Sequence, residues 1–255
     1  MKPSGGRWEL RMRFLMDDKD IYSGAAVVIP AAGSSVRMEA GRNKQFLKVS
    51  GVPILARTIS IFKEMPEIDR IIVVLNPDEF DVFRDEIAVP YGLTDIEVVA
   101  GGADRQSSVY EGLRALDDMP DDAVLLVHDG ARPLVTPAVI LDNIHGACEF
   151  GAAVTAVPVS NTIKITNSKG FSVQTPERDT LYEAQTPQGF RIGVFRQAAE
   201  QAQKTGFTGT DDVSLVERMG LPVRITKGSR RNLKITVPED MIIAEALFAQ
   251  PDPKC

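Results

Sequence analysis

The chain has 255 residues, 44% of them hydrophobic and 25% charged, which is typical of a globular protein. A chain of this length buries about three quarters of its unfolded surface, so one large domain can form alone. The formal net charge of −6 excludes a globally basic nucleic-acid binder, and any positive site must be local.

The two cysteines, Cys148 and Cys255, lie far apart in the sequence. This excludes a disulfide framework and a metal-ligand spacing, and it favours a reducing, cytoplasmic compartment. No apolar run reaches the roughly 18 residues that a membrane span needs, so we expect no membrane partner. Residues 1–23 are charged and lack the apolar core of a signal peptide. We predict a disordered extension at 1–23 and a folded domain at 24–250.

From residue 24 onward, apolar runs alternate with helical stretches. The runs predicted as buried parallel strands are 25–29, 71–75, 96–99, 124–127 and 152–157. The predicted helices are 53–65, 78–87, 105–116 and 137–150. This alternation predicts a single Rossmann-like α/β domain whose mostly parallel sheet is covered on both faces.

Residues 160–175 break the alternation. Two short β-branched runs, 162–166 and 171–175, flank Asn167-Ser168-Lys169-Gly170, which is a hairpin signal. We therefore predict a hairpin arm, at about 159–179, that projects from the domain.

Small residues and cations follow the first predicted strand. Pro30-Ala31-Ala32-Gly33 opens this loop, and Arg37 and Lys44 come after it. Small residues let backbone N–H groups approach a phosphate, and the two cations add positive charge. The loop spells neither a P-loop nor a dinucleotide fingerprint. A solvated turn followed by surface cations is the alternative interpretation.

Polar clusters also follow the third and fourth predicted strands, at the sheet edge where α/β proteins bind ligands. Gly101-Gly102 permits a tight reversal before Arg105 and Ser108, which then face a ligand or merely cap a helix. After the fourth strand, Asp129 and Arg132 form an Asp-x-x-Arg pair that suits a hydroxylated substrate, magnesium or a plain turn. We predict that the neighbouring His128 is a packed residue and not a catalytic base.

The motifs P-A-A-G-x-x-x-R-M, K-Q-F, G-G-x-x-R-x-x-S-V, H-D-G-A-R-P, T-P-Q and N-x-K-x-T occur in this order. In this pattern the chain resembles the 2-C-methyl-D-erythritol 4-phosphate cytidylyltransferase family of the non-mevalonate isoprenoid pathway, over about 24–248. The resemblance implies transfer of CMP from CTP to 2-C-methyl-D-erythritol 4-phosphate, giving 4-diphosphocytidyl-2-C-methyl-D-erythritol and pyrophosphate. It also implies Mg²⁺ or another divalent cation, held mainly by the CTP phosphates, and a homodimer formed through the hairpin arm.

The resemblance further implies roles for individual residues. The catalytic cations would be Arg37, Lys44, Arg178 and Lys234. The CTP-binding residues would be Pro30, Ala31, Ala32, Gly33, Gly102, Arg105, Ser108 and Asp129. The acceptor-binding residues would be Asp129, Arg132, Thr162, Arg178, Thr186 and Thr210, with Thr162 and Arg178 reaching the neighbouring subunit's site.

Two alternatives stay open at this point. Ribitol 5-phosphate cytidylyltransferases share H-D-x-x-R-P, Q-T-P-Q and N-x-K-x-T, but they resemble this chain less at Pro30-Ala31-Ala32, Pro176-Glu177-Arg178 and Thr210-Asp211-Asp212. A non-catalytic nucleotide-binding protein is the other, because a fold alone does not establish activity. Such a relative would be expected to have lost one of the four catalytic cations, and all four are present.

Overall fold

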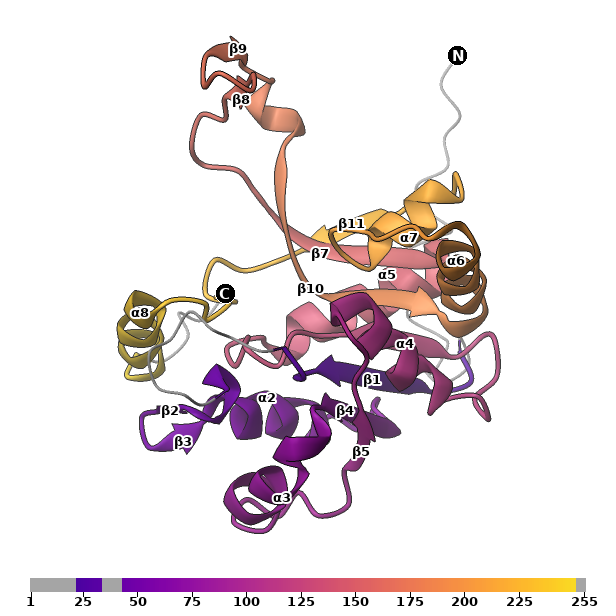
Figure 1. Cartoon of the computed structure of the whole chain (residues 1–255), viewed down its shortest axis with the longest axis vertical. Helices are drawn as coiled ribbons and strands as arrows, with labels where there is room; N and C mark the ends of the chain where they lie inside the picture. Colours follow the sequence, from indigo (N-terminus) through magenta and orange to yellow (C-terminus); the bar gives the residue numbers. More distant parts are fainter. Residues whose placement is uncertain (1–21, 34–42, 251–255) are drawn as a thin grey trace, which may run out of the picture.

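A seven-stranded sheet forms the centre of the computed structural model, which describes residues 22–33 and 43–250 (Figure 1). The strand order is β11-β7-β10-β6-β1-β4-β5. The strands are β1 (Ala25–Pro30), β4 (Arg70–Leu75), β5 (Glu97–Ala100), β6 (Val124–Val127), β7 (Ala152–Pro158), β10 (Tyr182–Arg191) and β11 (Arg224–Lys227). Only β10 among them runs antiparallel to its neighbours, which confirms the predicted mostly parallel sheet.

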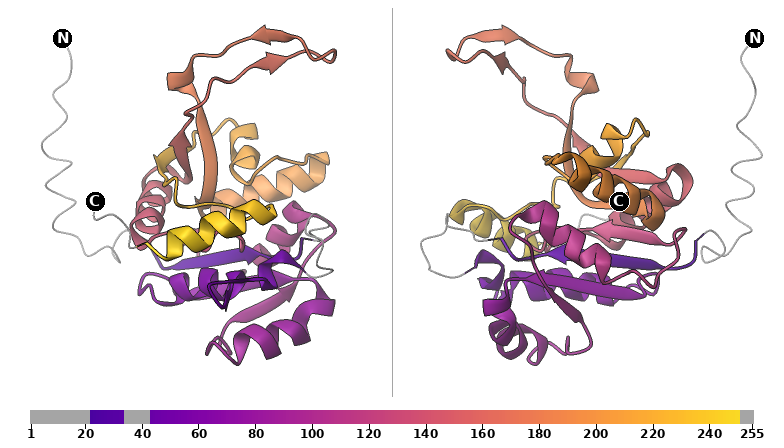
Figure 2. Two further views of the ribbon diagram at one scale, coloured as in Figure 1. Left: turned by 90° about the vertical axis from the view of Figure 1, so that its left-hand side faces the viewer. Right: turned by 45° about the vertical axis from the view of Figure 1, so that its right-hand side comes forward.

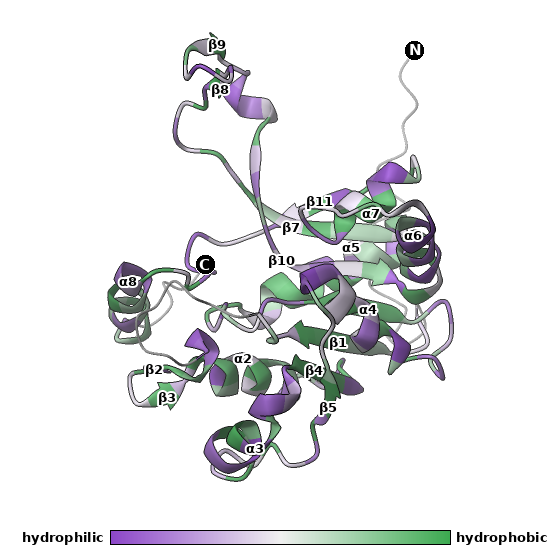
Figure 3. Ribbon diagram, viewed as in Figure 1, coloured by the Kyte–Doolittle hydropathy of each residue, from purple (hydrophilic) through white to green (hydrophobic). Residues whose placement is uncertain are grey.

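Helices cover both faces of the sheet. On one face lie α2 (Ile54–Lys63), α3 (Phe80–Phe83) and α5 (Pro137–Phe150), and on the other lie α4 (Arg105–Arg114), α6 (Ile192–Thr205) and α7 (Val213–Arg218). Each face of the sheet carries its own hydrophobic core, and successive residues of β1 pack into opposite ones, Val27 on one side and Val28 on the other. Burial on both faces explains why the central strands read as continuous apolar runs, which Figure 3 shows in green.

Further elements complete the chain. They are the 3₁₀ turns η2 (Lys44–Phe46), η3 (Pro77–Glu79) and η5 (Arg178–Thr180), the π turn η4 (Arg84–Ala88), the strand pairs β2 (Lys48–Val49) with β3 (Val52–Pro53) and β8 (Ile165–Thr166) with β9 (Ser172–Gln174), and α8 (Pro238–Phe248). The helix predicted at 78–87 is therefore present but irregular, with the α-helical turns of α3 between a 3₁₀ turn and a π turn. Asn76 caps a 3₁₀ turn at Pro77, and the wider π turn lets the adjacent Ile87 and Ala88 both enter the core.

The predicted hairpin projects far from the sheet (Figures 1 and 2). It leaves β7, turns through β8 and β9, and returns along β10. Every residue from Ser160 to Thr175 is exposed, including the large apolar side chains of Phe171 and Val173. A single chain thus gives this arm almost no packing of its own.

The predicted N-terminal extension and the predicted site residue Arg37 fall outside the described residues, apart from residues 22 and 23 of the extension. Arg37 lies within residues 34–42, all of which are outside them. Within the described part of the chain, no helix is long and apolar enough to cross a membrane.

Candidate active site

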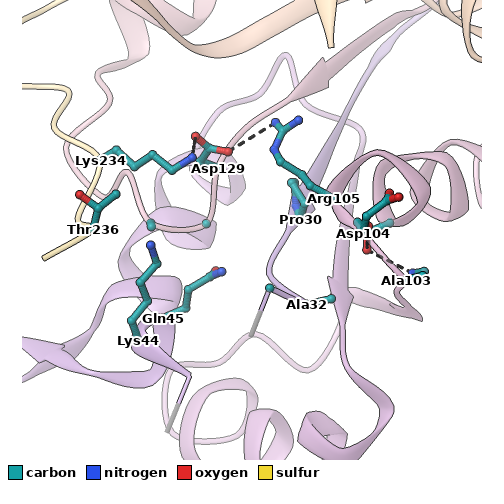
Figure 4. Close-up of a pocket in the computed structure, with 15 residues that line it drawn as sticks. Pro30, Ala32, Lys44, Gln45, Ala103, Asp104, Arg105, Asp129, Lys234 and Thr236 are labelled. Atoms are coloured by element: carbon teal, nitrogen blue, oxygen red, sulfur yellow. Dashed lines mark hydrogen bonds and ion pairs between the residues drawn. The ribbon is translucent and has the colours of Figure 1, made fainter. Parts of the chain in front are cut away.

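A cavity of about 670 Å³ opens beside the carboxyl ends of β1, β5 and β6 (Figure 4). Its walls come from segments far apart in the sequence: the loop after β1, η2, the turn from β5 into α4, the end of β6 and the segment before α8. The parallel topology brings these segments together, because the strands that precede them all end at the same edge.

Asp129 is the buried carboxylate of this cavity. Its Oδ2 lies 2.9 Å from Lys234 Nζ and 3.3 Å from Arg132 Nε, and its Oδ1 lies 3.4 Å from Arg105 Nη2. Burial opposes the charge, but these three cations hold the pKa of Asp129 well below its usual range. The carboxylate is therefore ionised at neutral pH and fixes the cations around it.

Arg105 is held from a second side by Asp212. The Arg105 Nη1 and Nη2 groups donate to the two carboxylate oxygens of Asp212 at 2.9 and 2.7 Å, a bidentate pairing. Although burial works against the charge, Asp212 and Asp129 raise the pKa of Arg105 above its ordinary value. Arg105 begins α4, so its fixed charge adds to the positive end of that helix at the cavity wall.

Lys234 is positioned by its neighbours in the chain. Ile235 is fully buried, and its N–H donates to the Ala131 carbonyl oxygen at 2.9 Å. The Asp240 carboxylate accepts from the N–H and the hydroxyl of Thr236 at 2.6 and 2.8 Å. The segment is thereby fixed between β6 and α8, and Lys234 extends toward Asp129 and the cavity (Figure 4).

The loop after β1 and the turn before α4 are packed against each other. Ser108 Oγ accepts from the Gly102 N–H at 3.1 Å and donates to the Asp104 carbonyl oxygen at 2.8 Å. A Cβ at Gly101 would lie 2.6 Å from Ala32 Cβ, so only glycine permits this approach. Asn43 joins η2 to the same wall, because its Nδ2 donates to the Ala31 carbonyl oxygen at 2.8 Å.

His128 lies beneath the cavity and is fully buried, which confirms the prediction of a packed residue. Thr186 Oγ1 accepts the Asp129 N–H at 3.0 Å, so its hydroxyl is available to donate to His128 Nδ1 at 3.1 Å. The Nε2–H of His128 then donates to the Arg132 carbonyl oxygen at 3.2 Å. Burial lowers the pKa of His128 to about 4, so the ring is neutral at physiological pH.

Comparison with known proteins agrees with this geometry. Residues 25–250 match the IspD family, described as 2-C-methyl-D-erythritol 4-phosphate cytidylyltransferase. The enzyme of that name from Geobacter metallireducens is 46% identical over 228 residues, which are 89% of this chain and 98% of the relative. The one from Bacillus velezensis is 47% identical over 224 residues, 87% of this chain and 94% of the relative. The chain belongs to this family.

Solved structures of the family share the fold. The crystal structure of 4-diphosphocytidyl-2C-methyl-D-erythritol synthase from Anaerococcus prevotii has a TM-score of 0.79 at 33% identity, covering 91% of this chain and 98% of that one. The cytidylyltransferase structure from Thermus thermophilus has a TM-score of 0.73 at 32% identity, covering 89% and 100%. The α/β architecture inferred from the sequence is thus confirmed.

The structure brings most of the residues implied by the cytidylyltransferase resemblance into one place. Those that line the cavity are Pro30, Ala32, Gly33, Lys44, Gly102, Arg105, Ser108, Asp129 and Lys234. Arg132 and Thr186 lie behind the wall, where they bond to Asp129. The N–H of the buried Ala31 donates to Val74, so this residue supports the loop.

Other implied residues lie elsewhere. Thr162 and Arg178 are exposed on the arm, and Thr210 is exposed in the loop before α7. Arg37 falls outside the described residues. In contrast, Gln45 and Thr236 line the cavity, and Asp212 anchors Arg105, although none of the three was assigned to the site from the sequence.

Proposed function

We propose that this cavity binds CTP and that the chain transfers its CMP group to 2-C-methyl-D-erythritol 4-phosphate, with release of pyrophosphate. The observation that carries the proposal is a cavity lined by Lys44, Arg105 and Lys234, of which the last two are held by the ionised Asp129. A positive cavity at the end of a parallel sheet suits a triphosphate, and family membership supports the same activity.

The chemistry explains why cations dominate the site. The acceptor phosphate is already a nucleophile at neutral pH, so no side chain needs to deprotonate it. One of its oxygens forms a bond to the α-phosphorus of CTP, and the bond from that phosphorus to pyrophosphate breaks. Lys44 and Arg37 would stabilise the charge that builds up on the α-phosphate oxygens, with Lys234 assisting. The burial and neutrality of His128 agree with a reaction that needs no histidine base.

We also propose that Mg²⁺ enters with CTP and neutralises part of its phosphate charge. Among residues 22–33 and 43–250, no group of three or more His, Cys, Asp or Glu side chains is placed to hold a metal ion. The oxygens of Asp129 are already paired with Lys234, Arg132 and Arg105. Phosphate oxygens and water would therefore supply most of the ligands, which is the usual manner of Mg²⁺ binding.

We further propose a homodimer in which each arm completes the other subunit's site. The arm exposes Phe171 and Val173, at 68% and 59%, which a partner would cover. Its return path carries the exposed Arg178. In the partner's site, Arg178 and Thr162 would bind the acceptor phosphate, and Thr210 would approach from the chain that supplies the cavity.

Pyrophosphate release with Mg²⁺ tests the reaction directly. CTP should support fast release with 2-C-methyl-D-erythritol 4-phosphate, and ATP, GTP and UTP should not. Preference for ribitol 5-phosphate would keep the chemistry but overturn the assigned acceptor. A folded protein that binds CTP and releases no pyrophosphate with either acceptor would overturn the enzymatic assignment.

A further inference from the structure

Gln188 is a buried amide on β10 that lies one layer behind the cavity. Its side chain carries no charge of its own, and the residue is only 2% exposed. The amide is directed at the start of α7, the helix that begins immediately after Asp212. Gln188 therefore connects β10, the antiparallel strand of the sheet, to the residue whose carboxylate anchors Arg105.

Three hydrogen bonds fix this connection. Gln188 Oε1 accepts the N–H groups of Asp212 and Val213 at 3.0 and 2.9 Å. Gln188 Nε2 donates to Asp211 Oδ2 at 3.0 Å. Backbone N–H groups can only donate, so the orientation of the amide is determined by the network itself.

The first turn of α7 depends on these bonds. Asp211 Oδ1 accepts the Ser214 N–H at 3.1 Å, which caps the helix start from the other side. Asp212 has no side-chain cap of its own, because both of its carboxylate oxygens receive Arg105. The position of that carboxylate is thus set by its backbone, and Gln188 holds the backbone.

We propose that Gln188 is a positioning residue for nucleotide binding. It holds the start of α7 so that Asp212 meets Arg105, and Arg105 in turn presents its charge at the cavity wall beside Asp129. The inference rests on the proposed function, because it assigns the nucleotide to the cavity that Arg105 lines. An amide suits the position better than a carboxylate or an apolar group, since two donors and one carboxylate acceptor face it at once.

A swap of hydrogen-bond polarity tests this role. In Gln188→Glu, the new carboxylate still accepts from both N–H groups but faces Asp211 without a proton between them. We expect the Kd for Mg²⁺-CTP, measured by titration calorimetry near pH 7.5, to rise on the order of tenfold, because a hydrogen bond to a charged group is lost and a repulsion is added. Adding Asp211→Asn supplies a donor at position 211, and the double variant should return to within about threefold of the wild type.

The kinetic readout separates positioning from general damage. Gln188→Glu should raise the KM for CTP more than it changes the KM for the acceptor. Asn143→Ala is the matched control, since Asn143 is also a fully buried amide that donates two hydrogen bonds, to Thr155 and Thr226, on the α5 side of the sheet. It should lower the melting temperature and leave the CTP Kd unchanged.

Clear outcomes would overturn the proposal. These are an unchanged CTP Kd in Gln188→Glu, a double variant that regains the wild-type melting temperature without regaining affinity, and equal loss of affinity in Asn143→Ala. If the wild type itself fails to bind CTP, the proposed function fails instead, so the two failures are distinguishable.

Discussion

Lys234 and Arg105 at the candidate site each pair with a carboxylate and also remain partly exposed. Both contact Asp129, yet their side chains keep 39% and 36% of their area exposed, so part of each charge faces the cavity. Asp129 holds them in position before a ligand arrives. Cations fixed in advance stabilise developing negative charge without reorganisation during the reaction, which is where electrostatic catalysis gains its effect.

Lys44 gives the first prediction at this scale. It lines the cavity from η2, and Lys44→Ala removes a charge that we place at the α-phosphate. We expect kcat to fall at least about a hundredfold, by analogy with the loss of one oxyanion-hole donor. Lys48 is the matched control, because it is an exposed lysine four residues further along. Lys48→Ala should keep kcat within about twofold of wild type, and near-normal turnover in Lys44→Ala would remove Lys44 from the catalytic set.

His128 predicts a pH dependence of stability. The folded protein keeps it neutral down to pH about 4, whereas the unfolded chain protonates it near pH 6.5. The unfolded chain binds more protons between these values, so the free energy of unfolding should rise with pH across this window. The titration of this residue alone should make the free energy of unfolding about 3 kcal/mol lower at pH 4 than at pH 7. Urea titrations of wild type and His128→Gln at a series of pH values would check this. An equal change of the free energy of unfolding with pH in both proteins would contradict it.

At the scale of elements, the cavity wall depends on the contact between the loop after β1 and the turn before α4. Gly101→Ala would place its methyl group 2.6 Å from Ala32 Cβ and 2.9 Å from Ser108 Oγ. The two loops must separate to accept it, which should lower the free energy of unfolding by about 1–3 kcal/mol and weaken CTP binding. Denaturant titration and calorimetry measure the two effects. Gly92→Ala is the contrasting variant: its φ of +65° would strain an alanine but nothing lies within 4 Å, whereas Gly101→Ala meets steric contact without a positive φ.

The elements that could be predicted from the sequence are those whose pattern is local. The runs at 124–127 and 137–150 coincide with β6 and α5, because continuous apolar character and a Thr-Pro helix start need no tertiary information. β10 was not predicted as a strand, since Tyr182–Arg191 contains Pro187 and several polar residues. Its polar side chains Gln185, Thr186 and Gln188 are buried because partners from distant segments satisfy them.

The candidate site shows the same division. Asp129 and Lys234 could be assigned from the family motifs, and the structure places both at the cavity. Asp212 could not be recognised as the anchor of Arg105, because 107 residues separate the pair and an Asp at a helix start already has an ordinary explanation as a cap. Ion pairs of this kind depend on how α4 and α7 pack on one face of the sheet, which composition and periodicity do not specify.

At the scale of the whole molecule, the cavity and the arm are the two halves of one proposed site. The cavity holds the cations assigned to CTP, while Arg178 and Thr162 lie on an arm that points away from the sheet (Figure 2). A chain that carries both halves cannot bring them together without moving the arm. The proposed two-fold dimer would solve this, because each subunit would then receive the arm of the other.

Mixed dimers give the decisive test of that arrangement. Lys44→Ala leaves the arm intact and disables the cavity, whereas Arg178→Ala does the reverse, so each variant alone should be nearly inactive at low acceptor concentration. In a mixed dimer, the cavity of the Arg178→Ala chain meets the intact arm of the Lys44→Ala chain, and one of the two sites is whole. Equal amounts of the two variants, unfolded and refolded together, should therefore regain about a quarter of wild-type activity, since half of the dimers are mixed. If each chain instead forms its own site, both sites of every mixed dimer carry a defect and no activity returns.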